Sequence, residues 1–395
     1  MNSAYELRLY DETLLTFSYE DAAFGTQTIQ PLYVNEEKRQ LLPLDLVADG
    51  DGIAKWLDRR IIPKNRAFVD EILKTMGLSR NDTRGIIDVC KGLSLNDSYW
   101  IVPAGFTGTF AAFNLYENRF SEILSLVAYT GYGGNDAAFS TSPEFTTNGM
   151  LPKAWRFIEG AGIFLYKGGT SGAANAGMEP YSEFYACQIA ETMGLDATSY
   201  DLENWKGMLA SKCKLFTDID TAFVPIGRVV QTGGLAACFD YCNELGESFA
   251  ETMRSMLVLD AVIYNDDRHF GNFGFLRDNK TGEIIAPAPL FDHGMSLFNF
   301  AMPSDIEDLD AYAKTRAPAY GGNASFESIC REVMGTVQRE QLRRLIGFEF
   351  QKHPTINWPD DRLKAIERHT QKRVRQLLEL GARERKRPGK TGQER

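Results

Sequence analysis

The sequence has few of the residues that build metal sites and disulfide scaffolds, with only four histidines and six cysteines in 395 residues. The cysteines are scattered, and the closest pair, Cys238 and Cys242, has no second close pair to complete a zinc site. No apolar run approaches 18 residues, and the N-terminus lacks a basic segment followed by an apolar one. These absences argue against a membrane span, a secretory signal and a zinc scaffold. They predict a cytoplasmic protein with reduced, mostly buried thiols.

The charge balance also lacks a basic excess, since 53 acidic residues outnumber 43 basic ones and give a net charge of -10. Such a chain is not expected to bind nucleic acid directly over a broad surface. The exception is the tail at 383–395, where six basic residues accompany two acidic ones, and we expect this end to be disordered. The length allows two or three domains.

Pattern changes along the chain predict an α+β protein. Residues 5–21 resemble a β-hairpin and residues 53–78 a helical zone, so the first 130 residues form a small α+β region. Two short apolar strands, at 154–158 and 163–167, flank a glycine-containing turn. A helix is predicted to begin at Pro180 and to end before Gly194. Two strands around the turn at 218–220 follow, and from Glu244 the chain is mainly helical, with a strand pair embedded at 273–287.

This order is typical of a two-lobed protein-kinase-like fold. We expect an N-terminal region at 1–130, an N-lobe at 131–243, a helical C-lobe at 244–382 and the tail at 383–395. Phosphoryl transfer from ATP needs a carboxylate beside the acceptor hydroxyl, oxygen ligands for magnesium and cations on the phosphates.

The stretch YNDDRHFGNFGFLRD, at 264–278, supplies candidates for this chemistry. Asp267 and Asn272 have the Asp-x4-Asn separation of a kinase catalytic loop, in which the Asp accepts the substrate proton and the Asn binds metal. Asp292 follows the embedded hairpin, which is expected to bring its carboxylate back to the site as a second metal-binding carboxylate. Lys167, at the end of a strand, is predicted to contact the α and β phosphates, with Glu183 on the following helix as its ion-pair partner.

These residues carry a family resemblance. Asp267-Arg268-His269-Phe270-Gly271-Asn272 is similar to the Asp-x-His-x-x-Asn loop of the HipA-like kinases, and Asp292, Lys167 and Glu183 match further family positions. The resemblance spans roughly residues 140 to 380 and implies ATP- and magnesium-dependent phosphorylation of Ser or Thr on a protein substrate. Members of this family often act as toxins neutralised by a small DNA-binding antitoxin. The resemblance therefore implies a partner of this kind but does not identify it.

The predicted phosphate loop departs from the family pattern, which has a Gly- and Ala-rich segment with an autophosphorylated Ser. Here the segment is FTTNGMLPKAW, in which Thr146 or Thr147 would replace that serine. Backbone N–H groups of Thr147, Asn148 and Gly149 are candidates for binding phosphate, and Lys153 would add charge. The adenine is expected near Phe223 and Val224, at the start of the predicted hinge 223–227.

Two alternatives remain open at this point. A metal-dependent phosphohydrolase would use Asp266, Asp267, His269, Asp292 and His293. A degenerate kinase would bind nucleotide without transferring phosphate. His269 is expected to shape the loop rather than to act as a base. Asp260, in the helix before the loop, either orients the loop or caps a local backbone group. The glycines at 168, 169, 172 and 177 are expected to form a linker.

Overall fold

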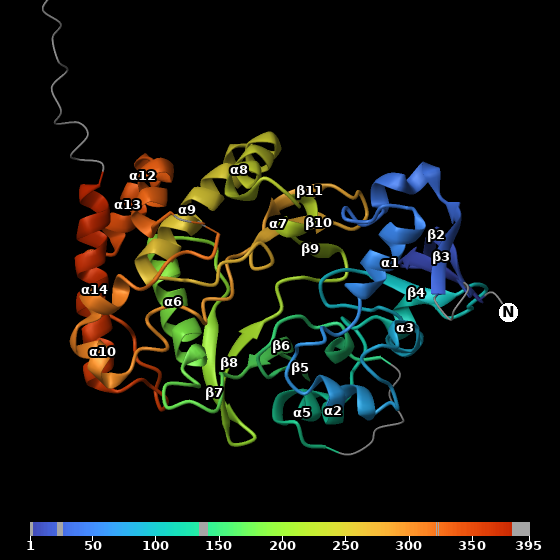
Figure 1. Cartoon of the computed structure of the whole chain (residues 1–395), viewed down its shortest axis with the longest axis horizontal. Helices are drawn as coiled ribbons and strands as arrows, with labels where there is room; N and C mark the ends of the chain where they lie inside the picture. Colours follow the sequence, from blue (N-terminus) through green and yellow to red (C-terminus); the bar gives the residue numbers. More distant parts are fainter. Residues whose placement is uncertain (1–2, 22–26, 134–140, 321, 323, 381–395) are drawn as a thin grey trace, which may run out of the picture. The chain divides into compact units, whose positions relative to one another are not determined.

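The computed structural model describes residues 3–21, 27–133, 141–320, 322 and 324–380, so the predicted tail at 383–395 lies outside the described residues. The chain divides into two compact units. Unit 1 contains residues 1–170, 204–229 and 274–288, and unit 2 contains residues 171–203, 230–273 and 289–395. The mixed helix and strand content confirms the α+β prediction (Figure 1). The predicted domain limits stay predictions.

The first sheet of unit 1 has the strand order β3-β2-β1-β4. The predicted N-terminal hairpin is confirmed, because β1 and β2 pair antiparallel with Tyr5 opposite Phe17. Alternate residues Tyr5, Leu7 and Leu9 are buried, as expected of a strand with one face on a core. The predicted helical zone contains most of α1 and all of α2. The bounds are β1 Ser3–Leu9, β2 Glu12–Asp21, β3 Gln27–Val34, η2 Glu36–Leu41, α1 Gly50–Asp58, α2 Val69–Lys74, α3 Thr83–Cys90, β4 Tyr99–Pro103 and α4 Phe110–Phe113.

The second sheet has the order β5-β6-β8-β7 and contains the other predicted hairpin. Its strands β5 and β6 pair antiparallel, and Lys153 lies directly opposite Lys167. Helix α5 packs on β5, and Ser125 on this helix donates a hydrogen bond to the Trp155 carbonyl at 2.8 Å. The bounds are α5 Glu122–Thr130, η3 Pro143–Phe145, β5 Lys153–Ile158, β6 Gly162–Lys167, β7 Tyr200–Trp205 and β8 Met208–Lys214.

The third sheet, β11-β10-β9, confirms the predicted strand pair at 273–287. The two strands predicted around the turn at 218–220 are confirmed as β8 and β9, of which β8 pairs with β6 and β9 pairs with β10. The second strand ends early. It stops at Pro225, which has no N–H to continue a ladder, and α7 follows directly. The bounds are β9 Thr221–Pro225, α7 Ile226–Val229, β10 Gly274–Asp278 and β11 Ile284–Pro287.

Unit 2 is built around helix α9, which is buried at every position from Ser255 to Ile263. Helices α6, α12, α13 and α14 pack around it and one another (Figure 1). The helix predicted from Pro180 is confirmed as α6, which ends at Gly194 with a φ of 78°. The bounds are α6 Glu179–Met193, α8 Gly234–Leu245, α9 Glu247–Ile263, α10 Pro303–Glu307, α11 Leu309–Ala313, α12 Phe326–Val333, α13 Thr336–Arg344 and α14 Asp360–Glu379.

Two composition-based expectations can be compared with the described part of the chain. None of its helices is long and apolar enough to cross a membrane. Its six cysteines are all free thiols, and only Cys213 is not fully buried, which confirms the expected thiol state. The glycine-rich stretch at 168–177 has no regular helix or strand, as a linker requires.

Candidate active site

The predicted catalytic loop follows α9 in unit 2 and is shaped by its own backbone. Helix α9 ends at Tyr264, whose φ of 53° turns the chain out of the helix. The N–H of His269 donates to the Asp267 carbonyl at 2.8 Å, and the N–H of Asn272 donates to the His269 carbonyl at 2.9 Å. The Asp267 N–H donates to the Asn265 side chain at 3.2 Å. The loop therefore holds the backbone of Asp267 in place while its side chain is exposed.

Asn272 has the orientation that a cation ligand needs. Its side chain is 7% exposed, and its amide Nδ2 donates to the Asp267 carbonyl at 3.3 Å. Because the nitrogen is used inside the loop, the amide oxygen is the atom left to bind a cation. An amide oxygen is a hard ligand of the kind that magnesium prefers.

A single guanidinium, that of Arg268, joins the parts of this site. It pairs with Asp260 on α9 at 3.1 Å, and both side chains are fully buried. It also donates to the carbonyls of Asn272, at 3.1 Å, and Phe291. Asn272 and the residue before Asp292 therefore accept hydrogen bonds from the same nitrogen. This joins the backbone segments that carry the two predicted metal ligands, which are separated by a hairpin in the sequence.

The Arg268–Asp260 pair also settles the role of Asp260, which orients the loop. Asn265 Nδ2 donates to the same carboxylate at 3.2 Å, and the Tyr320 hydroxyl donates to it at 3.3 Å. Burial raises the pKa of Asp260 above its ordinary value, and the Arg268 guanidinium opposes this change. The hydrogen bonds from these three side chains compensate for the cost of burying a carboxylate in unit 2.

Asp292 begins a segment that is fixed to α6. Its φ of 59° is left-handed, and its N–H donates to the Tyr200 hydroxyl at 3.1 Å. The next N–H, that of His293, donates to the Glu183 carboxylate at 2.7 Å. Ser182 on α6 donates to the Ser296 carbonyl at 2.9 Å. Glu183 is therefore a support for the segment that carries Asp292. Its predicted ion pair with Lys167 would join the two units and stays a prediction.

The donor set suits magnesium better than a metal that needs several charged or imidazole ligands. Among the described residues, no group of three or more His, Cys, Asp and Glu side chains is placed to hold a metal ion. Asn272 and Asp292 supply one neutral and one charged oxygen. Magnesium commonly binds to one or two protein carboxylates and completes its shell with water and substrate phosphates.

Two other loop residues have structural partners. The ring Nδ1 of His269 accepts the Gly271 N–H at 3.0 Å, which confirms that this histidine shapes the loop. Asp266 pairs with Arg316 at 2.9 Å, and burial raises the pKa of its carboxyl group. His293 is fully buried, and its Nδ1 lies 2.9 Å from Arg268.

In unit 1, the two predicted phosphate-binding lysines are cross-strand neighbours. Lys153 and Lys167 are directly opposite on β5 and β6, so their side chains lie on the same face of the sheet. Both are buried, and Lys153 Nζ donates to the Asn148 carbonyl at 2.9 Å. Two ammonium groups on one face of a hairpin provide the cationic surface that phosphates require.

The predicted phosphate loop wraps around Lys153. Gly149 has a φ of 92°, and a Cβ at this position would lie 2.1 Å from Lys153 Nζ, so only glycine fits. Thr146 is 5% exposed and donates to the Leu93 carbonyl at 2.8 Å. Thr147 donates to the Pro143 carbonyl at 2.7 Å. Both threonine hydroxyls are therefore engaged within the protein.

A buried arginine that the sequence analysis did not identify organises this loop. Arg66 pairs with Glu144 at 2.5 Å, and both side chains are fully buried. Its guanidinium also donates to the carbonyls of Thr147, at 3.2 Å, and Lys153, at 2.9 Å. Burial raises the pKa of Glu144, and the nearby Arg66 charge opposes this change.

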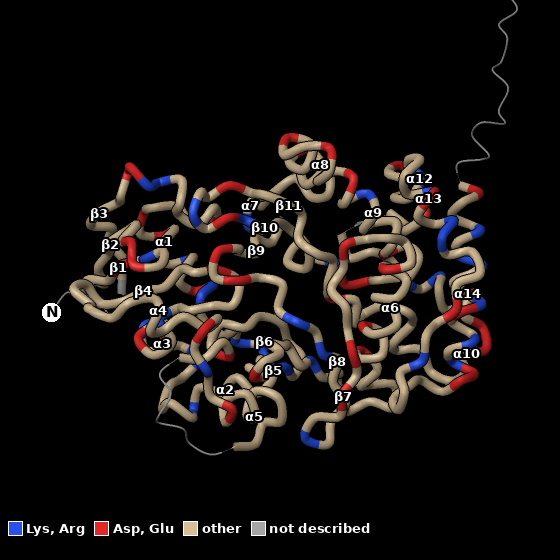
Figure 2. The backbone as a smooth tube through the Cα atoms, turned by 180° about the vertical axis from the view of Figure 1, so that it is seen from behind, with Lys and Arg blue, Asp and Glu red and all other residues tan. Residues whose placement is uncertain are grey.

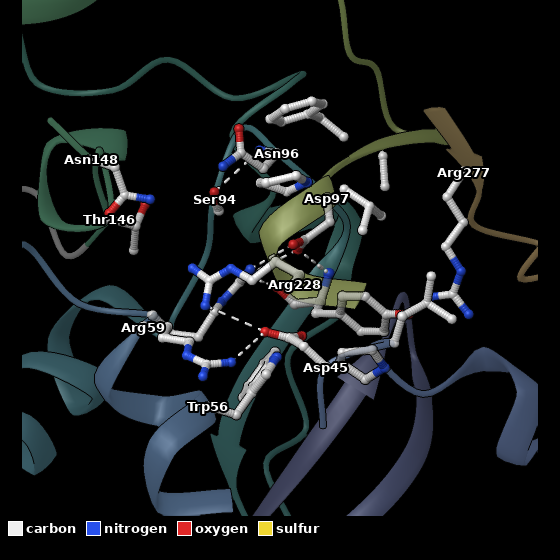
Figure 3. Close-up of a pocket in the computed structure, with 18 residues that line it drawn as sticks. Asp45, Trp56, Arg59, Ser94, Asn96, Asp97, Thr146, Asn148, Arg228 and Arg277 are labelled. Carbon is white, nitrogen blue, oxygen red and sulfur yellow. Dashed lines mark hydrogen bonds and ion pairs between the residues drawn. The ribbon is translucent and has the colours of Figure 1, made fainter. Parts of the chain in front are cut away.

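Phe223 and Val224, the predicted hinge residues, line a pocket of about 80 Å³ in unit 1 (Figure 3). Thr146 and Asn148 from the predicted phosphate loop line the same pocket. The Phe223 N–H donates to the Asn96 carbonyl at 2.7 Å. This N–H is therefore already used, and an adenine would have to bind to other backbone groups of the hinge. Figure 3 also shows Arg59 and Arg228 converging on Asp45, at 2.9 and 3.4 Å.

Comparisons with known proteins show similarity to kinases in part of the sequence and in the fold. The serine/threonine-protein kinase CtkA of Helicobacter pylori is 27% identical over 152 residues, which are 33% of this chain and 46% of that protein. The chain thus spans about half the length of the curated relative it matches. No family model matches the sequence.

Two solved structures are similar. HipA of Shewanella oneidensis MR-1, in a complex with HipB and operator DNA, aligns with a TM-score of 0.52 at 14% identity, over 95% of this chain and 99% of that chain. The Helicobacter pylori proinflammatory kinase CtkA aligns with a TM-score of 0.47 at 18% identity, over 60% of this chain and 93% of that chain. The HipA alignment shows the fold, and with the sequence match to CtkA it supports the HipA-like kinase family that the Asp-x-His-x-x-Asn loop indicated.

Proposed function

We propose that this protein is an ATP- and magnesium-dependent kinase that phosphorylates serine or threonine on a protein substrate. The observation that carries the proposal is the Arg268 guanidinium, which holds Asn272 and the segment of Asp292 beside the loop that presents Asp267. A phosphotransfer site needs these three oxygen-bearing side chains together. The kinase-like fold and the sequence match to CtkA support the same reaction.

Each residue then has one role. Asp267 aligns the acceptor hydroxyl and accepts its proton. The hydroxyl oxygen forms a bond to the γ-phosphorus, the bond between this phosphorus and the β–γ bridging oxygen breaks, and ADP leaves with that electron pair. Asn272 and Asp292 would hold magnesium, which neutralises phosphate charge when bound. Lys167 and Lys153 bind phosphate oxygens, and the backbone of Thr147, Asn148 and Gly149 closes over them. Phe223 and Val224 are proposed to lie near the adenine.

Location and partners belong to the same proposal. Transfer from ATP requires a compartment that contains ATP, for which we propose the cytoplasm. The similar HipA structure contains HipB and operator DNA, and a small antitoxin-like protein is the partner we propose for this chain. Because the net charge is -10, DNA contact would come through that partner.

Transfer of labelled γ-phosphate tests the proposal. Wild type should label a protein acceptor when ATP and magnesium are present, and Asp267→Asn should abolish labelling while ATP affinity, measured by calorimetry, stays within about threefold. Asp240→Asn, an exposed substitution on α8, is the matched control and should transfer normally. Full activity of Asp267→Asn would contradict the assignment. ATP binding without transfer in wild type would favour a nucleotide-sensing module, and phosphoester hydrolysis without nucleotide would favour the phosphohydrolase.

A further inference from the structure

Unit 2 contains a cavity of about 510 Å³ that no step of the proposed reaction uses. Residues of α11, α12 and α14 line it, together with Tyr264 at the end of α9. The charged or titratable residues that matter are Lys314, Arg316, Glu327, His369, Lys372 and Arg373. Its volume lies in the range of small-ligand sites.

The lining of this cavity is cationic although the protein as a whole is acidic. Four cations, Lys314, Arg316, Lys372 and Arg373, line it with only two carboxylates, Asp310 and Glu327. Figure 2 shows the basic residues along α14, on which two of these cations lie. Helix α12 begins at Phe326, so the positive end of its dipole also lies at the cavity. Among the described residues, Lys314 forms no ion pair.

Two buried nitrogens in the lining have no hydrogen-bond partner among the described residues. Arg373 is 2% exposed; its Nε donates to the Ala261 carbonyl at 2.9 Å and its Nη1 to Glu327, but its Nη2 has no acceptor. His369 is 9% exposed; its Nδ1 lies 3.2 Å from Asp310, and its Nε2 has no partner. A buried donor without an acceptor is destabilising. A ligand oxygen that accepted a hydrogen bond from Arg373 Nη2 would remove this cost.

The cavity is connected to the catalytic loop by direct contacts. The Arg373 guanidinium lies 4.5 Å from the ring centroid of Tyr264, which is three residues before Asp267. Arg316 pairs with Asp266, the immediate neighbour of Asp267. A ligand that binds to Arg316 or Arg373 therefore acts on the residues that precede the proposed catalytic carboxylate.

We propose that this cavity binds a phosphomonoester group, through Arg373, Lys372, Lys314 and Arg316. A phosphomonoester carries close to two negative charges and three acceptor oxygens, so one group can pair with several of these cations, which a single carboxylate cannot. Lys372 is half exposed and pairs with Asp310 at the mouth of the site, so its ammonium group is accessible to a ligand. The group belongs either to a phosphorylated residue of the acceptor protein or to a free small molecule that controls the loop. Binding of a phosphomonoester to this cavity does not depend on the proposed kinase activity. A role of the cavity in selecting the acceptor protein does rest on that activity.

Calorimetry with O-phosphoserine on the full chain tests this proposal. A saturating non-hydrolysable ATP analogue with magnesium is added first, so that the lysines of unit 1 are already occupied. Wild type should bind O-phosphoserine, and Lys314→Met with Lys372→Met should weaken binding at least tenfold. Lys364→Met, an exposed lysine on α14 that does not line the cavity, is the matched control and should bind as wild type does.

Folding defects are separated from binding defects by the choice of variants. The two lysines are exposed, and their replacement should leave the melting temperature unchanged. Arg373→Lys, which keeps the charge but loses Nη2, should also weaken binding. Absence of binding to wild type, or equal binding by the double variant, would overturn the proposal.

A phosphoserine peptide distinguishes the two sources of the group. Affinity at least tenfold above that of O-phosphoserine indicates a phosphorylated protein, and equal affinity indicates a free phosphomonoester. Because none of these measurements requires phosphate transfer, failure of the kinase assay leaves their outcome unaffected.

Discussion

Replacing Arg268 with Met should unfold or severely destabilise unit 2 and abolish transfer. The substitution leaves the Asp260 carboxylate fully buried without its ion-pair partner, and breaking such a pair costs about 3 to 5 kcal/mol. The carbonyls of Asn272 and Phe291 also lose their donor. Since domains are stable by only about 5 to 15 kcal/mol, this change is a large part of the total. Urea unfolding followed by circular dichroism measures it.

A double variant separates the stability effect from the catalytic one. Asp260→Leu together with Arg268→Met removes both charges, and apolar replacement of a buried pair is often close to neutral. It should recover at least half of the lost stability but none of the transfer activity, because nothing then joins the Asn272 and Asp292 segments. Lys352→Met, which removes an exposed ion pair with Asp360, is the control and should not change the midpoint. Recovery of activity in the double variant would refute the proposed role of Arg268.

Three further predictions concern separate sites. Asp292→Ala should remove the magnesium-dependent part of ATP affinity, so calorimetric titrations with and without the metal should coincide; a difference as large as that of wild type would exclude Asp292 as a ligand. Gly149→Ala should weaken ATP binding at least tenfold, because its φ of 92° is unfavourable for alanine and its Cβ would displace the Lys153 ammonium; unchanged affinity would exclude this loop from the nucleotide site. Burial lowers the pKa of His369 from its ordinary value of 6.5 to about 4. As the pH falls, the unfolded chain therefore binds a proton at this histidine before the folded chain does. The stability due to the neutral ring is complete above pH 6.5 and declines as the pH falls toward 4. The free energy of unfolding of His369→Gln should lack this decline between pH 6.5 and 4, and a parallel pH profile would contradict it.

The elements that the sequence predicted correctly are those with a local cause. The β5–β6 hairpin follows from two apolar runs around a glycine-containing turn, and α6 follows from Pro180 in its first turn and Gly194 at its end. The loop at 267–272 was noticed because Asp267 and Asn272 are close in the sequence, and its catalytic role stays a prediction. The turn at 218–220 predicted the two strands around it but not their partners, β6 for β8 and β10 for β9, because strand partners depend on long-range packing that a turn of three residues does not reveal.

The residues that organise the site were the hardest to predict. Arg268 was noted only as part of the loop motif, and Arg66 was not noted at all, because a surface arginine and a buried one have the same sequence signal. Asp260 offered a hint, since a carboxylate within the otherwise apolar stretch 256–263 must be paired. The bond from the His293 N–H to Glu183 was not predicted, and the ion pair of Glu183 with Lys167 stays a prediction. Glu183 and His293 are 110 residues apart in the sequence, and only the folded structure identifies such partners.

The same contacts weigh against the phosphohydrolase. That reaction would need Asp266 and His293 as free metal ligands beside Asp292. Asp266 is paired with Arg316, and an Arg268 guanidinium nitrogen lies 2.9 Å from His293 Nδ1. A cation bound at that imidazole nitrogen would have to displace a buried, positively charged group that also holds Asp260 and two backbone carbonyls. From unit 2, phosphotransfer uses the exposed Asp267 carboxylate, the Asn272 amide oxygen and the Asp292 carboxylate, and it leaves these supporting contacts intact.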